Sequence, residues 1–464
     1  MTTEPTTDDL TDRVAAAAAD DGAVEQVVSG RAHGPPRSEP SAPVVPTPAG
    51  ATPVRSLLQP AFWLLLVLLV IGSVHLIGMV SDAFGLYPIA TATAAVLFTL
   101  YAIPFVLVLR SIDFLEREPL LLVAAAVAWG GVVATTTGIA GDTAVRDILA
   151  KLGSPAFATA WGPAIAGPAL EEVLKTLGVV VVVLVARKQV NSVVDGAVYG
   201  AFVGLGFQVV EDFVYAVNAV GIDGRGDHVG PVIATFVLRG FLGGLWSHTL
   251  FSALAGAGVA YFVVRRGNRS RARRIAVAVL GLGGAWLCHF VWNSPWLSDG
   301  FGYGLAGILT ALLVKGVPAL AMILLLVRAA SRGEADFYLH ELASLGDPRI
   351  ITEGEMEVLR TGHRRLVARR YAYARCGRPG STAVRRLQFA QARLAVELSR
   401  EGDRVPQERD AVLSLRRHLA AIGHPEAVGP PGQPRAWGAV VVGLCFGVVV
   451  IITVAVAIHA LGGN

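Results

Sequence analysis

The sequence predicts an all-α polytopic membrane protein with about nine transmembrane helices, a buried polar site among the fourth to seventh spans, and a cytoplasmic helical segment. Of the 464 residues, 53% are hydrophobic and 16% charged, and the mean hydropathy is +0.57, which is too apolar for a soluble domain. A helix of about 20 apolar residues crosses the roughly 30 Å of hydrocarbon in a bilayer. Runs of this kind lie near 60–80, 88–109, 119–141, 156–186, 195–219, 232–264, 275–296, 302–328 and 437–461.

Composition divides the chain into four parts. Residues 1–55 combine Ala, Thr, Pro and Asp without an apolar period, and we expect a disordered, acidic cytoplasmic N-terminus. Residues 56–330 carry the first eight spans and form the predicted membrane core. Residues 331–436 hold 18 Arg and 13 acidic residues with helical patterning, which predicts an Arg-rich helical cytoplasmic region before a last transmembrane helix at 437–464. A solvated, salt-bridged surface and contact with anionic lipid headgroups are both compatible with that Arg excess.

Basic residues at alternate ends of the spans predict the orientation of the chain. Cytoplasmic loops of membrane proteins carry an excess of Lys and Arg, so we expect a cytoplasmic N-terminus and an external C-terminus. The formal net charge is only +4, and this balance does not favour nucleic-acid binding. The flanking basic residues are Arg55, Arg110, Arg117, Arg187, Lys188, the block 265–274, Arg328, Arg332 and Arg435.

Ionisable residues inside four of the spans mark the candidate site. An ionisable side chain at the centre of a bilayer costs about 2.5–3.5 kcal/mol on insertion scales, so one that occurs there is by default a functional hypothesis. Spans one to three and nine carry almost nothing comparable. The candidate residues are Glu171, Glu172 and Lys175 in the fourth span, Glu211 in the fifth, His248 in the sixth, and His289 with Asn293 in the seventh.

Helical spacing places these groups on shared faces. Lys175 lies four residues after Glu171 and three after Glu172, so its ammonium can neutralise either carboxylate. His289 and Asn293 are also four residues apart, so both can point into one cavity. Counted along each span, the polar groups of all four spans lie roughly 10 Å from the outer boundary. This agreement in depth predicts one buried site in the outer half of the bilayer.

Other polar residues near the site have structural interpretations. We expect Arg239 to be a snorkelling or structural charge near the outer interface, and Asp195 and Asp212 to be structural. Proline suits the first position of a helix, so the Gly167-Pro168 step is expected to break the long fourth span. The carboxylates that follow it would then lie in a first turn, at the positive end of a helix.

The candidate residues suit the activation of water. Two imidazoles and a carboxylate can bind a divalent metal such as zinc, while a further carboxylate accepts a proton. No His-Glu-x-x-His or Gly-x-Ser-x-Gly motif occurs, and Cys288 points about 100° away from His289 on a helix, so we expect Cys288 to be a packing residue. Buried carboxylates and histidines also mark proton and cation pathways, so an ion- or proton-coupled membrane transporter is the alternative, although no inverted repeat is visible.

Four sequence motifs occur in order along the core. They are Glu-Glu-x-x-Lys after Gly167-Pro168, the stretch from Asp195 to Glu211 with its Gly-Leu-Gly-Phe segment, the span from Arg239 to His248, and His289-x-x-x-Asn293. Together they resemble the motifs of the PrsW-type intramembrane metalloprotease family, which is similar to the CAAX protease and bacteriocin-processing superfamily. The resemblance covers about residues 110–300.

The resemblance implies an intramembrane metallo-endopeptidase in a bacterial plasma membrane. Its substrates would be helices of other membrane proteins, such as anti-sigma-factor-like single-pass proteins, and its surroundings the lipid bilayer. Zinc is the expected metal. The implied site consists of the catalytic residues Glu171, Glu172, Lys175 and Asn293 and the metal ligands Glu211, His248 and His289.

Within this site, the resemblance implies a separate role for each catalytic residue. Glu171 would be the general base on a metal-bound water, Lys175 would orient or neutralise Glu172, and Asn293 would hold the oxyanion. Position 211 is Glu, as in the PrsW pattern, where the wider superfamily has His. Whether Glu211 is itself a metal ligand therefore stays open.

Overall fold

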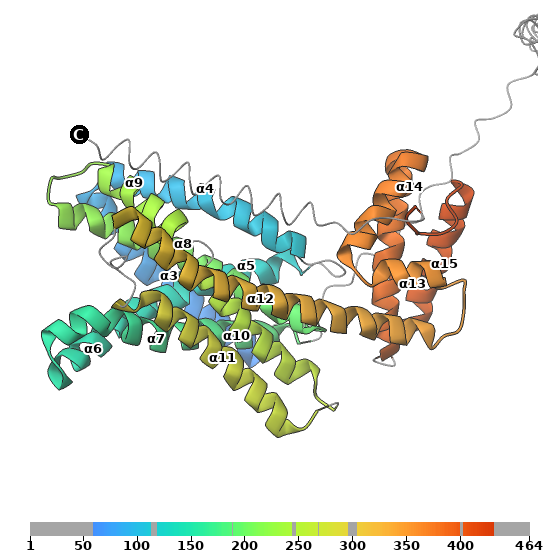
Figure 1. The fold of residues 1–464 in the computed structure, drawn as a ribbon, viewed down its shortest axis with the longest axis horizontal. Helices are drawn as coiled ribbons and strands as arrows, with labels where there is room; N and C mark the ends of the chain where they lie inside the picture. The colour runs from blue at the N-terminus through green and yellow to red at the C-terminus, as the bar shows by residue number, and fades with distance from the viewer. Residues whose placement is uncertain are drawn as a thin grey trace, which may run out of the picture. The chain divides into compact units, whose positions relative to one another are not determined.

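The computed structural model describes residues 59–112, 118–187, 189–243, 247–267, 269–295, 304–399 and 402–430. This part of the chain is helical and contains no strand, which confirms the all-α fold class. The predictions for residues 1–55 and 437–464 lie outside it. Figure 1 shows the elements, which are α3 (Pro60–Leu86), α4 (Pro88–Ile112), α5 (Leu120–Ala128), the π-helical turn η1 (Trp129–Ala134), α6 (Thr135–Leu152), α7 (Pro155–Val185), α8 (Val193–Asp223), α9 (Gly230–Val237), the π-helical turn η2 (Leu238–Gly243), α10 (Ser247–Val264), α11 (Arg271–Asn293), α12 (Gly304–Ala343), α13 (Glu353–Leu359), α14 (Gly362–Ser399) and α15 (Val405–Ala421).

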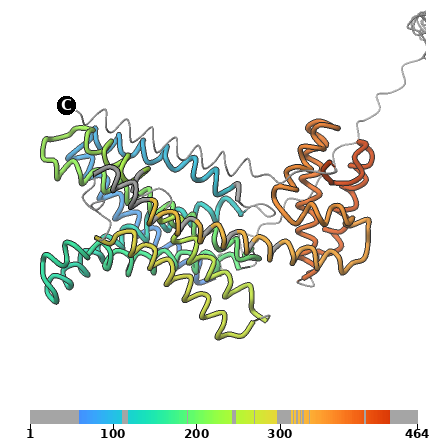
Figure 2. The backbone as a smooth tube through the Cα atoms, viewed as in Figure 1, coloured from blue at the N-terminus to red at the C-terminus, as the bar shows by residue number. Residues whose placement is uncertain are grey.

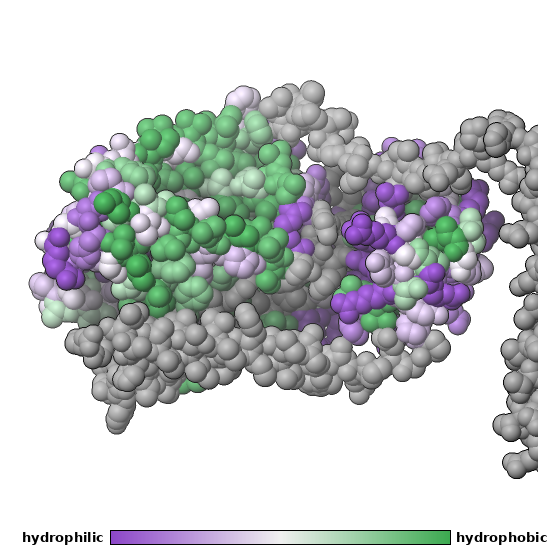
Figure 3. Space-filling model, turned by 90° about the horizontal axis from the view of Figure 1, so that it is seen from above, coloured by the Kyte–Doolittle hydropathy of each residue, from purple (hydrophilic) through white to green (hydrophobic). Residues whose placement is uncertain are grey.

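Several helices are long and apolar enough to cross a membrane. In the described part of the chain there are six, Pro60–Leu86, Pro88–Arg110, Leu120–Leu152, Val193–Asp223, Ser247–Val264 and Arg271–Asn293. The protein is therefore a multi-pass membrane protein. On the face drawn in Figure 3, hydrophobic residues form a broad patch among the described residues. The predicted count of nine is not confirmed. Helices α7 and α12 occupy the fourth and eighth predicted spans but are not among the six, and the ninth span lies outside the described residues.

Close packing of α8 against α10 positions one side of the candidate site. A glycine stripe of α8, Gly196, Gly200 and Gly204, faces α10, and a Cβ at any of the three would overlap the α10 backbone. For Gly204 the overlapping atom is the carbonyl oxygen of His248. Small residues let helix backbones approach closely in membranes. The stripe thus holds His248 directly against α8.

The third predicted span, 119–141, is part of a longer continuous helical stretch. It runs over Leu120–Leu152, from α5 through η1 into α6. Gly130 in η1 lies so close to the α8 backbone that a Cβ there would overlap it. The indole N–H of Trp129 donates to the carbonyl of Leu174 on α7 at 2.9 Å. The π-helical turn therefore contacts both helices that carry acidic site residues.

Helix α7 is continuous, so the expected break at Gly167-Pro168 is wrong. The helix begins after Ser154, whose side-chain oxygen accepts a hydrogen bond from the backbone N–H of Phe157 at 3.0 Å, and Pro163 and Pro168 both lie inside it. Prolines are tolerated in membrane helices because neighbouring helices re-satisfy the freed backbone groups. Helix α7 packs against α6, α8, α10 and α11. Its two adjacent carboxylates consequently lie in mid-helix and not in a first turn.

A second hydrophobic core follows the membrane helices. It combines the last turns of α12 with α13, α14 and α15, through which Figure 2 traces the backbone. The helical pattern predicted for this region is confirmed, since Leu387, Ala390 and Leu394 of α14 are fully buried, as are Leu342 of α12 and Leu415 of α15. The cytoplasmic location of this core stays a prediction.

Candidate active site

Helix α7 contributes three adjacent charged groups to one buried face. The ammonium nitrogen of Lys175 lies 2.6 Å from Oε1 of Glu172 and 3.4 Å from Oε2 of Glu171. All three side chains are buried, and Lys175 is fully enclosed. The helical spacing predicts that the ammonium can neutralise either carboxylate, and in the structure it lies near both.

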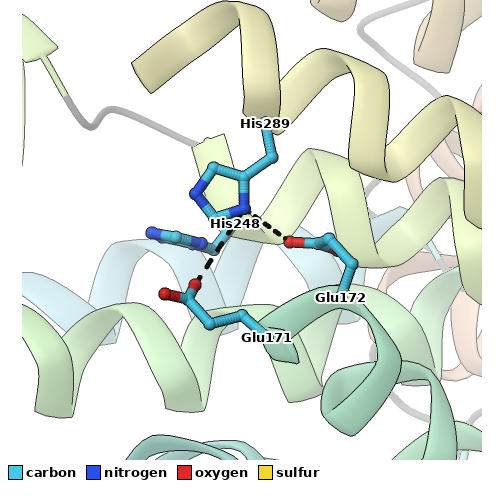
Figure 4. A group of neighbouring side chains, drawn as sticks. All are labelled: Glu171, Glu172, His248 and His289. Carbon is cyan, nitrogen blue, oxygen red and sulfur yellow. Dashed lines mark hydrogen bonds and ion pairs between the residues drawn. The ribbon is translucent and has the colours of Figure 1, made fainter. Parts of the chain in front are cut away.

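Helix α11 brings His289 to the same carboxylates. Nδ1 of His289 lies 2.9 Å from Oε1 of Glu172 and 4.0 Å from Oε2 of Glu171, and Figure 4 shows the ring directed at both. The side-chain amide of Asn293 donates to Nε2 of His289 at 3.0 Å and to the carbonyl of Pro163 at 3.1 Å. As the four-residue spacing predicts, His289 and Asn293 point in one direction, and Asn293 ties α11 to α7.

Helix α10 adds His248 to the same group. Its Nδ1 lies 3.0 Å from the ammonium nitrogen of Lys175, and its Nε2 lies 3.0 Å from Oε2 of Glu211 on α8. The His248 and His289 rings are nearly perpendicular, with centroids 4.9 Å apart. The structure thus brings together all seven residues predicted from the sequence, on four different helices.

Four of these side chains form a group that could hold a metal ion. Glu171, Glu172, His248 and His289 each offer one ligand atom, these atoms lie within 4.8 Å of one another, and all four residues are buried. Carboxylate and imidazole ligands suit zinc and similar divalent metals. Glu211, which was expected among the ligands, is not in the group and contacts the far nitrogen of His248.

Arg239 and Asp212 contact Glu211 or its partners, and the structural roles expected for both stay predictions. Arg239 donates from Nε to Oδ1 of Asp212 at 2.5 Å and from Nη2 to Oε2 of Glu211 at 2.6 Å, and its guanidinium lies 3.9 Å from the ring centroid of Tyr215. Glu211 is therefore held between Arg239 and His248. The sequence contains a signal for this contact. Arg239 lies in the sixth predicted span and the adjacent acidic residues Glu211 and Asp212 lie in the fifth, at a similar depth, so they can form ion pairs.

Asp142 on α6 is a further acidic residue near the site. Its Oδ2 accepts a hydrogen bond from Nε of Arg146 at 2.6 Å, while its buried Oδ1 has no hydrogen-bond partner among the described residues. A Cβ at Gly167 would lie 3.8 Å from this oxygen and 3.1 Å from Oε1 of Glu171. The predicted span ends at residue 141, so nothing in the apolar pattern extends a helix to Asp142.

Aromatic rings enclose the polar groups. The ammonium of Lys175 lies 4.2 Å from the ring centroid of Phe207 on α8, and Phe251 on α10 stacks on His289 with centroids 5.3 Å apart. Excluding water in this way strengthens electrostatic interactions, because the local dielectric constant is low. The site can therefore hold charged groups firmly and act strongly on charge that develops in a substrate.

Part of the chain that includes the candidate site matches a known protein family. A family model described as PrsW family intramembrane metalloprotease matches residues 118–326. This match confirms the resemblance seen in the motifs, and it spans every candidate site residue from Asp142 to Asn293. The description names a metalloprotease, which is a hydrolase, located within the membrane. No curated protein and no solved structure matches the chain.

Proposed function

We propose that this protein is an intramembrane endopeptidase that hydrolyses peptide bonds of membrane-protein substrates, with Glu171 as the base that activates water. One observation carries the proposal. Two carboxylates and two imidazoles from three helices lie buried around one centre, inside the segment that matches the protease family. Such a set can accept a proton and polarise a carbonyl at the same place.

Exposure distinguishes the two carboxylates. The side chain of Glu171 is 10% exposed, whereas that of Glu172 is 1% exposed and lies between Lys175 and His289. Water therefore reaches Glu171 more readily, and Glu172 is the anchored partner. In the proposed reaction, Glu171 takes a proton from water as the water oxygen attacks the peptide carbonyl carbon, and it later gives this proton to the amine that leaves.

The remaining residues hold the metal and position the reacting groups. Glu172, His248 and His289 would hold a divalent metal, with zinc as the proposed ion, and a metal bound there supplies a Lewis acid that polarises the peptide carbonyl. Glu211 orients His248 by accepting from its Nε2, as carboxylates do behind metal-binding histidines. Asn293 is the proposed donor to the oxyanion, for which it would exchange its contact with the Pro163 carbonyl for the substrate.

The proposed substrates are single-pass membrane proteins, such as anti-sigma-factor-like proteins, and the proposed location is a bacterial plasma membrane with the N-terminus in the cytoplasm. The distribution of Lys and Arg at the ends of the spans supports this orientation. Residues 331–436 would then form a helical region on the cytoplasmic side, between the membrane core 56–330 and a last membrane helix at 437–464.

Fragment analysis of membrane proteins tests this function. Wild-type protein, Glu171→Gln, His248→Ala and the control Asp147→Asn are compared in cells and then in proteoliposomes. Asp147 is an exposed carboxylate on α6, so its variant keeps wild-type fragments. Loss of the base should lower the rate about 10²–10⁴-fold, and His248→Ala should abolish the same fragments. Identical fragments from all four proteins would refute proteolysis at this site and direct attention to proton-coupled transport.

A further inference from the structure

The centre of the Glu/His cluster is already in contact with a cation of the chain itself. The ammonium nitrogen of Lys175 lies 2.6 Å from Oε1 of Glu172, 3.0 Å from Nδ1 of His248 and 3.4 Å from Oε2 of Glu171. These are three of the four residues that could ligate a metal. An ammonium has three N–H donors and no acceptor, so each donor finds one of the candidate ligands.

The hydrogen bonds of His248 fix its tautomer in a way that favours this contact. Its Nε2 faces Oε2 of Glu211, an oxygen that also accepts from Arg239. A carboxylate only accepts hydrogen bonds, so Nε2 carries the hydrogen, and Nδ1 directs its lone pair at Lys175. The inner nitrogen of His248 therefore points at the centre of the cluster, where it meets an ammonium.

The hydrogen bonds of His289 fix the other tautomer, in which Nδ1 carries the hydrogen. The side-chain nitrogen of Asn293 donates to the carbonyl of Pro163, which fixes the amide, and the same nitrogen donates to Nε2 of His289. Nδ1 of His289 must then carry the hydrogen, which it donates to Oε1 of Glu172 at 2.9 Å. In this arrangement the inner nitrogen of His289 is a donor and offers no lone pair to a metal.

We propose that the Lys175 ammonium is a resident cation of the cluster that competes with a divalent metal for the same ligand atoms. The proposal rests on the proposed function, in that the same residues hold the metal. Ligand atoms bind zinc at about 2.0–2.2 Å, so an ion bound by Glu172 and His248 would take the position of the ammonium. Metal binding thus requires Lys175 to leave this position, and His289 to exchange its tautomer as the Asn293 amide turns.

The burial of the cluster explains why a resident cation is needed. Glu172 and Lys175 are fully buried, and Glu171 is nearly so. Removing one partner of a buried ion pair leaves an uncompensated charge, which strongly destabilises a protein. Without metal, Lys175 supplies the positive charge that keeps the two carboxylates and His248 together. The ligands are therefore assembled before a metal arrives, but the metal binds against competition.

Metal affinity of the full-length protein in nanodiscs tests this competition. Lys175→Met is compared with wild type and with Lys151→Met, which removes an exposed ammonium on α6. We expect Lys175→Met to bind zinc at least about tenfold more tightly than wild type, because the competing cation is gone and the two carboxylates are uncompensated. Its metal-free form should unfold at a lower temperature, and saturating zinc should restore more stability than in wild type. Lys151→Met should match wild type in both measurements.

Equal or weaker zinc binding by Lys175→Met would overturn the proposal, as would the absence of zinc binding by both proteins. The cleavage assay is run in parallel. If wild type cleaves its substrate but Lys175→Met binds zinc no more tightly, competition fails and the proposed function stands. If zinc affinity rises as expected but no protein yields fragments, the cation exchange stands and the proposed function fails.

A measurement on folded wild-type protein covers the case in which Lys175→Met does not fold. The chain has only four lysines, Lys151, Lys175, Lys188 and Lys315, so the side-chain nitrogen signals of ¹⁵N-lysine-labelled protein are few enough to assign. The enclosed Lys175 ammonium should give a signal that exchanges slowly with water. Titration with zinc should shift this signal in proportion to the zinc bound, and an unchanged Lys175 signal at stoichiometric zinc would overturn the proposal.

Discussion

Arg239 connects the surface of the membrane core to a histidine of the site. Its side chain is 33% exposed, yet its Nε and Nη2 groups hold Asp212 and Glu211 at 2.5 and 2.6 Å. Glu211 in turn accepts from His248. A planar guanidinium can hold two carboxylates at fixed angles, which the single ammonium of lysine cannot do. We therefore propose that Arg239 is a positioning residue that acts on the site through Glu211.

Replacing Arg239 with Lys should lower both zinc affinity and the cleavage rate about 10–100-fold, the usual effect of losing a partner that orients a metal ligand. The positive charge is kept, so the protein should still fold. The readouts are zinc affinity and separate values of kcat and KM, with the loss expected in kcat. Arg225→Lys, at an exposed pair with Asp223, is the control. Wild-type kcat and zinc affinity in Arg239→Lys would contradict the positioning role.

Residue types and spacing predict the centre of the site but not its periphery. Glu171, Glu172, His248 and His289 stand out in the sequence because charge is costly in apolar spans, and the structure brings them together. Arg239 lies close to a predicted span end, where snorkelling explains an Arg equally well, so its pairing with Glu211 depends on how two helices pack. Asp142 lies beyond a predicted span, where an acidic residue attracts no notice.

At the scale of helices, the glycine stripe of α8 controls the distance between His248 and its partners. A Cβ at Gly200 would overlap the backbone carbonyl of Ser252 on α10, so a larger side chain must push the two helices apart. His248 lies one turn before Ser252 and would move with it away from Glu211. The small residues thus serve the geometry of the site as well as packing.

Gly200→Leu should lower the free energy of unfolding by about 1–3 kcal/mol, as overpacking does. It should also slow cleavage about 10²-fold, since displacements near 1 Å at a catalytic group have effects of this size. Gly78→Leu is the matched control, because a Cβ at Gly78 meets nothing within 4 Å. Thermal unfolding and fragment formation are measured for both variants. A wild-type cleavage rate in Gly200→Leu would show that the close α8–α10 contact is not needed.

The length of an apolar run predicts that a helix is present, but prolines and charged segments give poor predictions of where a helix ends. The span expected at 119–141 continues to Leu152, because residues 142–152 extend α6 beyond the apolar run. The Gly167-Pro168 step was expected to end a helix, but α7 continues through it because neighbouring helices pack on both sides. These differences come from tertiary contacts, which a single run of sequence does not contain.

At the scale of the whole molecule, the described residues form hydrophobic cores that share no residue with one another. The largest one combines side chains from α3 to α10, and the second combines the end of α12 with α13, α14 and α15. The candidate site lies on helices of the membrane core, whereas the buried Glu355 lies on α13, a helix that contributes Val358 and Leu359 to the second core. Composition predicts this division, since the charge content rises after residue 330, although the number of spans is not confirmed.

Glu355→Ala tests whether the second core can be destabilised without affecting the candidate site. The Glu355 side chain is 1% exposed, pairs with Arg416, and accepts hydrogen bonds from Gln391 and from the backbone of Ala427, both at 3.0 Å. Removing one partner of a buried pair costs about 3–5 kcal/mol, so the transition of the C-terminal helices in calorimetry should move to a clearly lower temperature.

The same variant should leave zinc affinity and the cleavage rate within about twofold of wild type, because Glu355 shares no partner with the site residues among its contacts to Arg416, Gln391 and Ala427. Glu353→Ala, which removes an exposed carboxylate from the first turn of the same helix, should change neither property by more than a small amount. A loss of zinc affinity in Glu355→Ala comparable to that in Arg239→Lys would instead show that the C-terminal helices are coupled to the site. The helical region that follows the eighth predicted span would then regulate the proposed protease.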